Sequence, residues 1–196
     1  MRHLVVGMLA LMFSVAPAFA QTTARPAAKG PQTPKSAGAG PVLVIETAKG
    51  TIEMETYPTE APKTVAQILA LVKRNFYNGQ RVHRVVKGFV VQFGDPQTRD
   101  MTKRERWGTM GSGKAIGVGE FSKLRTHKLG AVAMAHPGDA TKGDSQMYIT
   151  LAPTPRLDGS YTVFGQVISG MDVVQKLEIP DVIRRVTVRV EAPAPK

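Results

Sequence analysis

Two polar side chains in a mostly apolar stretch, Arg84 and Gln92, are the residues of this chain whose placement most suggests chemistry. They lie on neighbouring predicted strands, residues 81–86 and 89–93. A guanidinium is always charged and carries a rigid fork of hydrogen-bond donors, so Arg84 could stabilise developing charge or orient a substrate. It could equally form an ordinary surface salt bridge, and from the residues alone this is the simpler interpretation.

Other chemistries find little support. No two of the four histidines stand at a metal-ligand spacing, and the chain has no cysteine, so no metal site is expected. His83 lies in a strand pattern, where a structural histidine with satisfied hydrogen bonds is expected. His136 lies in a turn beside Pro137 and should be exposed.

A glycine-rich loop at residues 108–115 nearly fits a phosphate-binding loop, with Ala115 where a hydroxyl should hold magnesium. The sequence that follows, Ile-Gly-Val-Gly, cannot open a stable helix, so we interpret the segment as a flexible surface loop. Ser112 stands between two glycines, but the motif is too short for a nucleophile elbow. No nucleophile and no cofactor are therefore expected.

The elements that must position these residues are mostly strands, because period-2 alternation dominates after residue 42. Helical spacing occurs twice, first at residues 65–72 after Pro62 and then at residues 171–177 before Pro180. We predict strands at residues 42–47, 51–55, 81–86, 89–93, 131–135, 146–151, 161–168 and 182–190. Eight short strands and two helices predict a closed antiparallel β-barrel whose open ends are covered by the helices.

Three blocks of this sequence resemble the cyclophilin-type peptidyl-prolyl cis-trans isomerases. Residues 82–95 read VHRVVKGFVVQFGD and resemble the family signature F-H-R-h-h-x-G-F-h-h-Q-G-G-D, where h is apolar. Residues 130–135 and 145–150 read GAVAMA and SQMYIT and resemble G-x-h-x-M-A and S-Q-F-F-I-T. Residues 157–159 and 163–165 resemble L-D-G and V-F-G, and all blocks occur in the family's order.

The resemblance implies a mostly β fold, an eight-stranded barrel with two helices, and a site on the barrel's outer face. It makes Arg84 the catalytic arginine and Gln92 the glutamine that orients it. Substrate binding is implied for the following residues: Phe89, Val90, Ala135, His136, Gln146, Tyr148, Leu157, Tyr161 and Phe164. The implied reaction is isomerisation of X-Pro peptide bonds, which needs neither a metal nor a cofactor.

Departures from the family pattern affect the rim of the implied site more than its centre. Phe93 stands where the signature has glycine, and aromatic Tyr148 and Tyr161 replace phenylalanine and histidine. The larger departure is Arg156, a position that is often tryptophan and is associated with tight binding of cyclosporin, the family's cyclic-peptide ligand. We therefore expect weak cyclosporin binding and a preference for acidic residues near the proline.

The chain begins like an exported protein. Arg2 precedes an apolar run, and Pro17 and Ala18-Phe19-Ala20 end it, as in a signal peptide of residues 1–20 cleaved after Ala20. Residues 21–41 are rich in proline, alanine and glycine and predict a disordered linker. Residues 42–190 then form the isomerase domain and residues 191–196 a short tail. We expect a periplasmic or secreted monomer without a stable membrane anchor.

The expected partners are proline-containing peptides and unfolded exported proteins. The formal net charge of +11 permits nucleic-acid binding, but export argues against it. Two other interpretations remain open: a non-catalytic peptide-binding module, and an adhesive basic surface for anionic polymers or lipid headgroups. The residues of that basic surface would be Lys103, Arg104, Arg106, Lys114, Lys123, Arg125 and Lys128.

Overall fold

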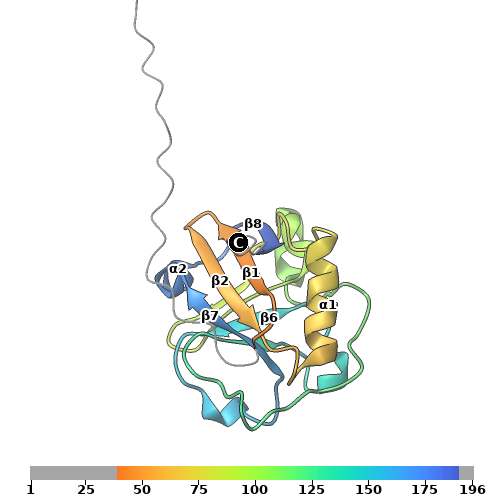
Figure 1. Cartoon of the computed structure of the whole chain (residues 1–196). Coiled ribbons are helices and arrows are strands. Elements are labelled where there is room, and N and C mark those ends of the chain that lie inside the picture. Colours follow the sequence, from red (N-terminus) through yellow and green to blue (C-terminus); the bar gives the residue numbers. More distant parts are fainter. Residues whose placement is uncertain (1–38, 190–196) are drawn as a thin grey trace, which may run out of the picture.

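The computed structural model describes residues 39–189 and shows one curled, eight-stranded antiparallel sheet (Figure 1). The order across the sheet is β3-β4-β6-β5-β7-β2-β1-β8. The strands are β1 Val42–Thr47, β2 Thr51–Thr56, β3 Arg84–Val86, β4 Val90–Phe93, β5 Ala131–Met134, β6 Met147–Thr150, β7 Val163–Ser169 and β8 Ile183–Val188. All eight fall within the segments predicted from alternation, except that β2 and β7 each extend one residue beyond the predicted end.

Both predicted helices are present, α1 at Pro62–Lys73 and α2 at Met171–Lys176. Pro62 opens α1, where its missing N–H costs no hydrogen bond. Helix α1 lies near β8 and α2 near β2, and Figure 1 shows them to the right and to the left of strands β1 and β2. Within residues 39–189, no helix is long and apolar enough to cross a membrane.

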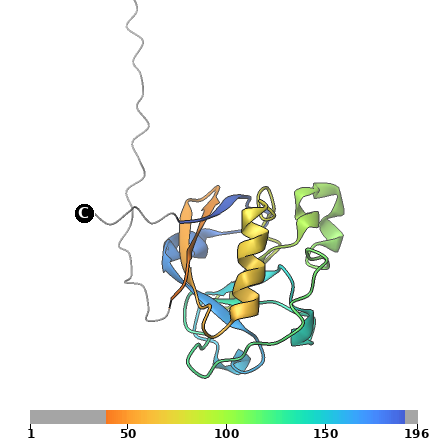
Figure 2. The same ribbon diagram turned by 45° about the vertical axis from the view of Figure 1, so that its right-hand side comes forward.

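Four short 3₁₀ helices were not predicted: η1 Pro96–Arg99, η2 Met101–Arg106, η3 Ala140–Lys142 and η4 Pro155–Leu157. Asp95, Asp100 and Asp139 begin the first three, and each carboxylate accepts a backbone N–H two residues later. Figure 2 shows the η1–η2 segment standing out from the body beside α1.

Alternation along the strands gives the sheet two apolar faces. On β4, Val91 and Phe93 enter the main core together with α1 and α2, whereas Val90 faces a smaller cluster on the other face. This second cluster consists of Tyr57, Val90, Ala131, Ala133, Tyr148 and Val163, bordered by Phe89, Ala135, Leu157 and Tyr161. The candidate site is built on this smaller cluster.

The expectation of a closed barrel is wrong, because the sheet is an open half-barrel whose edge strands are β3 and β8. Only three residues of the predicted strand 81–86 join the sheet. The chain before them instead contacts residues 181–183, at the start of β8, through a single bridge between Arg81 and Val182 and a few backbone hydrogen bonds.

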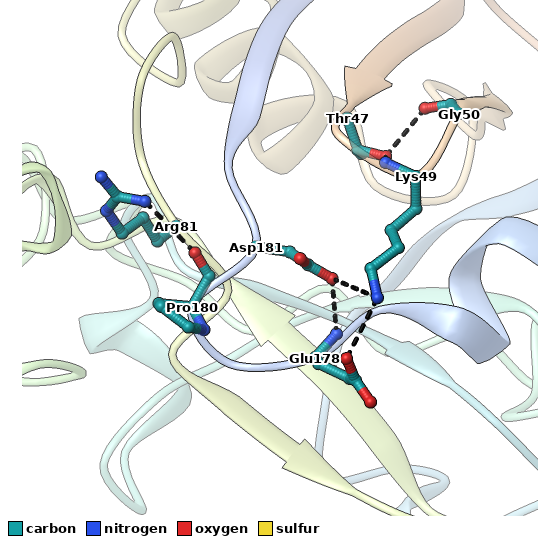
Figure 3. Close-up of polar contacts among 7 residues, drawn as sticks. All are labelled: Thr47, Lys49, Gly50, Arg81, Glu178, Pro180 and Asp181. Atoms are coloured by element: carbon teal, nitrogen blue, oxygen red, sulfur yellow. Dashed lines mark hydrogen bonds and ion pairs between the residues drawn. The ribbon is translucent and has the colours of Figure 1, made fainter.

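Side-chain contacts fasten the loop that enters β8 at this edge (Figure 3). Arg81 Nη1 donates to the carbonyl of Pro180 at 3.3 Å. Lys49 Nζ lies 3.0 Å from Glu178 and 3.7 Å from Asp181. The Arg81 contact joins the segment before β3 to the loop before β8, and the Lys49 contacts tie that loop to the turn between β1 and β2.

The predicted signal peptide, most of the linker and the C-terminal tail lie outside the described residues. Residues 39–41 of the predicted linker lie among the described residues, and Gly40 and Pro41 both contact Thr56 at the end of β2. Gly40 donates its N–H to the Thr56 carbonyl at 2.7 Å, and Thr56 Oγ1 donates to the Pro41 carbonyl at 2.8 Å.

Candidate active site

The centre of the candidate site is a single row of residues across five strands. In the register of the sheet, Arg84 of β3 faces Gln92 of β4, and Gln92 in turn faces Tyr148 of β6. Ala133 of β5 pairs with Tyr148 on one side and with Val163 of β7 on the other. Because a one-residue slip would turn each of these side chains to the opposite face, the register itself builds the site.

A cavity of about 160 Å³ opens over this row. Its walls are the side chains of Arg84, Phe89, Val90, Gln92, Ala135, His136, Tyr148, Leu157 and Tyr161. The structure therefore brings together both residues predicted as catalytic and seven of the nine predicted to bind substrate. The lining is mostly apolar and aromatic, with the Arg84 guanidinium and the Gln92 amide at one side.

A chain of side-chain hydrogen bonds orients Arg84. Arg84 Nη1 donates to Gln92 Oε1 at 3.2 Å, and Gln92 Nε2 donates to Gln146 Oε1 at 2.9 Å. Gln146 Nε2 donates to the carbonyls of Gly108 and Met110 at 2.9 and 2.8 Å. Because the Gln92 amide nitrogen donates to Gln146, the Gln92 oxygen must point toward Arg84. The Arg84 guanidinium uses one donor in this contact and retains the others for a ligand.

The aromatic wall of the cavity is held from behind by a buried histidine. His127 Nε2 lies 3.0 Å from the Tyr148 hydroxyl, and its Nδ1 lies 2.7 Å from Asp158 Oδ1. Partial burial of Asp158 opposes its ionisation, but its hydrogen bonds with His127 hold the pKa of this carboxyl below its usual range. Burial raises the pKa of the Tyr148 phenol, so the hydroxyl stays protonated.

Tyr161 completes this wall. Its ring meets Tyr148 edge-on at 5.8 Å and stacks on His136 at 4.3 Å. His136 is half-buried, and its Nε2 contacts the Ser160 carbonyl at 3.0 Å, so the expectation of a simply exposed turn histidine is wrong.

A second, larger cavity of about 500 Å³ adjoins the first and shares Gln92, Ala135 and His136 with it. Gln146, the eighth predicted substrate-binding residue, lines this cavity. The sequence analysis missed its other walls, which are Gly108, Thr109, Met110, Gly111, Pro137, Lys142 and Asp144.

Part of this second cavity is the glycine-rich loop 108–115, which we had interpreted as a flexible surface loop. Two carboxylates fasten it instead. Asp95 Oδ2 accepts the N–H groups of Gly108, Thr109 and Met110 at 2.7, 3.1 and 3.3 Å. Asp144 accepts the Ser112 hydroxyl at 2.5 Å and the Gly113 N–H at 3.0 Å. These N–H groups already donate to carboxylates, so they are not available to bind a phosphate.

Phe164 is a correction to the predicted site. Its side chain is fully buried in the main core and does not line either cavity. On β7 the alternation directs Val163 to the small cluster and Phe164 to the opposite face. The same alternation carries the bulk of Phe93 into the core, where its ring lies 6.3 Å from that of Tyr77, away from the site.

The ring nitrogens of His83, a residue expected to be hydrogen-bonded, are buried and make no hydrogen bond of normal geometry, although the Gln146 side chain lies near enough to interact with the ring. Burial lowers its pKa from 6.5, against the opposing effects of the Asp95 charge and the Gln146 side chain. As the pH falls through 6.5, the unfolded chain therefore takes up this proton before the folded protein does. We predict that the free energy of unfolding falls with decreasing pH in this range, with a contribution from His83 of up to about 1.4 kcal/mol per pH unit.

Urea unfolding of the wild type and of His83→Gln at pH 7.5 and pH 5.5 measures this contribution. The wild type should lose more stability than the variant between the two pH values. An identical loss in both proteins would show that His83 is protonated equally in the folded and unfolded states.

Within residues 39–189, no cluster of three or more histidine and carboxylate side chains could hold a metal ion. At one side of the small cavity lies the always-charged guanidinium of Arg84, held by the Gln92 amide and keeping donors for a ligand. The arrangement can therefore stabilise a partial negative charge or a lone pair next to an apolar group.

The chain as a whole is similar in sequence to proteins of one known family. The family model described as cyclophilin type peptidyl-prolyl cis-trans isomerase/CLD matches residues 42–193. The peptidyl-prolyl cis-trans isomerase CYP18-2 of Arabidopsis thaliana is 37% identical over 145 residues, which are 71% of this chain and 82% of that protein.

Longer relatives contain the same region. The peptidylprolyl isomerase domain and WD repeat-containing protein 1 of Mus musculus is 36% identical over 171 residues, or 85% of this chain. The chain spans about a quarter of that relative's length, 24%.

Among solved structures, a cyclophilin type peptidyl-prolyl cis-trans isomerase of Cryptosporidium parvum, crystallised in the presence of the dipeptide Ala-Pro, superposes with a TM-score of 0.67. It is 22% identical, and the match covers 76% of this chain and 99% of the other. At this identity, the likeness supports the fold.

Proposed function

The chain belongs to the cyclophilin-type peptidyl-prolyl cis-trans isomerase family, and from this premise we propose that it isomerises X-Pro bonds in the cavity beside Arg84. The observation that carries this proposal is the position of the Arg84 guanidinium, oriented by Gln92 at the side of a small cavity with apolar walls. A relative of known fold was crystallised with Ala-Pro, a dipeptide that contains the proline such a cavity would take.

The reaction explains why these residue types suffice. The barrier to rotation about a peptide bond, about 18–20 kcal/mol, comes from the resonance of the planar amide. In the twisted transition state this resonance is lost and the prolyl nitrogen regains a lone pair. A donor aimed at that nitrogen stabilises the twisted state more than either planar state, and so lowers the barrier. No covalent bond is broken, and no nucleophile is needed.

Each part of the site has a separate task in this mechanism. We propose that Phe89, Val90, Tyr148, Leu157 and Tyr161 enclose the proline ring. The chain on one side of the bond is then held while the other side rotates. Arg84 supplies the donor, and the chain of hydrogen bonds through Gln92 and Gln146 keeps it in place before the substrate arrives. Such preorganisation avoids the cost of reorienting the donor during the reaction.

The second cavity provides a path for the peptide chain beyond the proline. Because Gln92, Ala135 and His136 border both cavities, a peptide whose proline fills the first can extend into the second. We propose that the backbone of Ala135 and His136 binds the peptide there, with Gln146 as a polar contact.

Exchange NMR of a proline-containing tetrapeptide tests the function. Catalytic amounts of the protein should accelerate cis-trans exchange far above the spontaneous rate, which corresponds to tens to hundreds of seconds. The alternative of a non-catalytic peptide-binding module uses the same cavity, and it predicts chemical-shift changes on binding with no faster exchange.

We further propose that the protein acts as a monomer outside the cytoplasm, on unfolded exported proteins whose folding waits for proline isomerisation. The signal-like residues 1–20 support this proposal. Amino-terminal sequencing of the exported form should begin at Gln21, whereas a start at residue 1 or 2 would contradict export by cleavage.

A further inference from the structure

Two guanidinium groups lie over the same aromatic ring at the small cavity. The Cζ atom of Arg84 lies 5.7 Å from the centre of the Phe89 ring, and that of Arg156 lies 4.7 Å from it. Both distances are within the range of cation–π contact, about 6 Å. Arg84 belongs to β3 and Arg156 to η4, so the fold brings together two positive charges that are distant in sequence.

Neither guanidinium has a counter-ion within the described residues. The hydrogen bond of Arg84 goes to the neutral amide of Gln92, and no ion pair or side-chain hydrogen bond involves Arg156. Asp158 is the nearest acidic residue along the chain, but its Oδ1 is held by the backbone N–H and the ring of His127. Two like charges at one ring repel each other, and an anion beside them would relieve this repulsion.

We propose that Arg156, together with Arg84, makes this site selective for peptides with a carboxylate side chain directly next to the proline. This inference rests on the proposed function, since it assumes that a proline fills the cavity lined by Phe89. A proline ring there places its two neighbouring residues at the mouth of the cavity, within reach of the flexible arm of Arg156. Arg84 is occupied with the prolyl nitrogen, so Arg156 is the specificity-determining residue of the pair.

The solvent exposure of the two arginine side chains sets the size of the expected preference for a carboxylate. Both arginines are exposed, so their attraction for a carboxylate is screened by water and weakened by salt. Exposed ion pairs contribute modestly, and with two cations present we expect kcat/KM to favour glutamate over glutamine by about threefold to tenfold at low salt.

The test uses peptides that differ only in charge: Ala-Glu-Pro-Phe against Ala-Gln-Pro-Phe, and Ala-Ala-Pro-Glu against Ala-Ala-Pro-Gln. Exchange NMR gives the rate, and chemical-shift titration of the same samples gives Kd independently of catalysis. In the wild type at least one glutamate peptide should be favoured over its partner. The preference should disappear in Arg156→Gln, reverse in Arg156→Glu, and fade in 0.5 M salt.

Lys87→Gln is the matched control, because Lys87 is an exposed cation in the turn after β3 and does not line the cavity. It should retain the preference. Equal rates and equal Kd for both members of each pair in the wild type would overturn the inference, as would a preference that survives in Arg156→Gln. Absence of any catalysed exchange would instead contradict the proposed function, while the Kd values still decide the charge preference.

Discussion

Replacing Arg84 by alanine is expected to lower kcat/KM for a proline-containing peptide by about 100-fold to 1,000-fold, the usual loss when a preorganised donor to the transition state is removed. The loss should fall mainly on kcat, since the donor acts when the nitrogen becomes pyramidal. Stability should change little, because the Arg84 side chain is exposed and makes a single hydrogen bond, to Gln92. The melting temperature should stay within about 4 °C of the wild type.

Arg84→Lys is the matched control for this experiment. Lysine keeps the charge but lacks the planar fork that bonds to Gln92 Oε1 and to a substrate at the same time. Its activity should lie between those of the wild type and the alanine variant. Full activity of Arg84→Ala in a folded protein would remove Arg84 from the mechanism and favour the peptide-binding interpretation.

The local pattern predicted most of the sheet. Alternation marks a strand wherever one face is buried, and for β1 the predicted and observed bounds agree, Val42–Thr47. The same pattern could not predict closure. Residues 81–83, Arg-Val-His, continue the alternation of the predicted strand, yet Arg81 and Val82 contact only the residues just before β8, through one bridge and one backbone hydrogen bond. Whether two edges meet depends on the curl of the whole sheet.

The site was predictable where it follows from the signature and not where it depends on long-range contacts. Arg84, Gln92 and Phe89 lie within nine residues of one another, so one motif contains them. His127 contacts Tyr148 because β5 and β6 bring the chain back, and its spacing to Asp158 corresponds to no local motif. Phe164 was assigned by motif, although simple alternation with Val163 would have placed it in the core.

For the loop 108–115, local sequence predicted flexibility where distant carboxylates in fact hold the backbone. A high glycine content indicates a flexible backbone. It gives no information about distant carboxylates that could hold that backbone in place. Asp95 belongs to the signature block, and its carboxylate reaches three backbone N–H groups of this loop. Conformational freedom along the chain is thus removed by an acceptor that local sequence does not reveal.

Arg156→Trp is expected to raise the affinity for cyclosporin by about tenfold to a hundredfold, which is the value of one good anchor contact of about 1–3 kcal/mol. The structure places Arg156 over Phe89, at the edge of the cavity where an apolar cyclic peptide would have to lie. Tryptophan offers a large flat apolar surface there and an indole N–H donor. Arginine offers a charged tip that prefers water and must be desolvated or displaced.

Arg156→Gln separates the two causes of weak binding. If desolvation of the guanidinium is the main penalty, the glutamine variant should recover affinity as well. If the missing aromatic surface dominates, only tryptophan should do so, and we expect this second result because an exposed arginine can turn its tip to solvent. Isothermal titration of the three proteins with cyclosporin gives the Kd values, with exchange NMR confirming that each still isomerises Ala-Gln-Pro-Phe. A wild type that binds as tightly as the tryptophan variant would show that the residue at this position does not limit access of the cyclic peptide to the cavity.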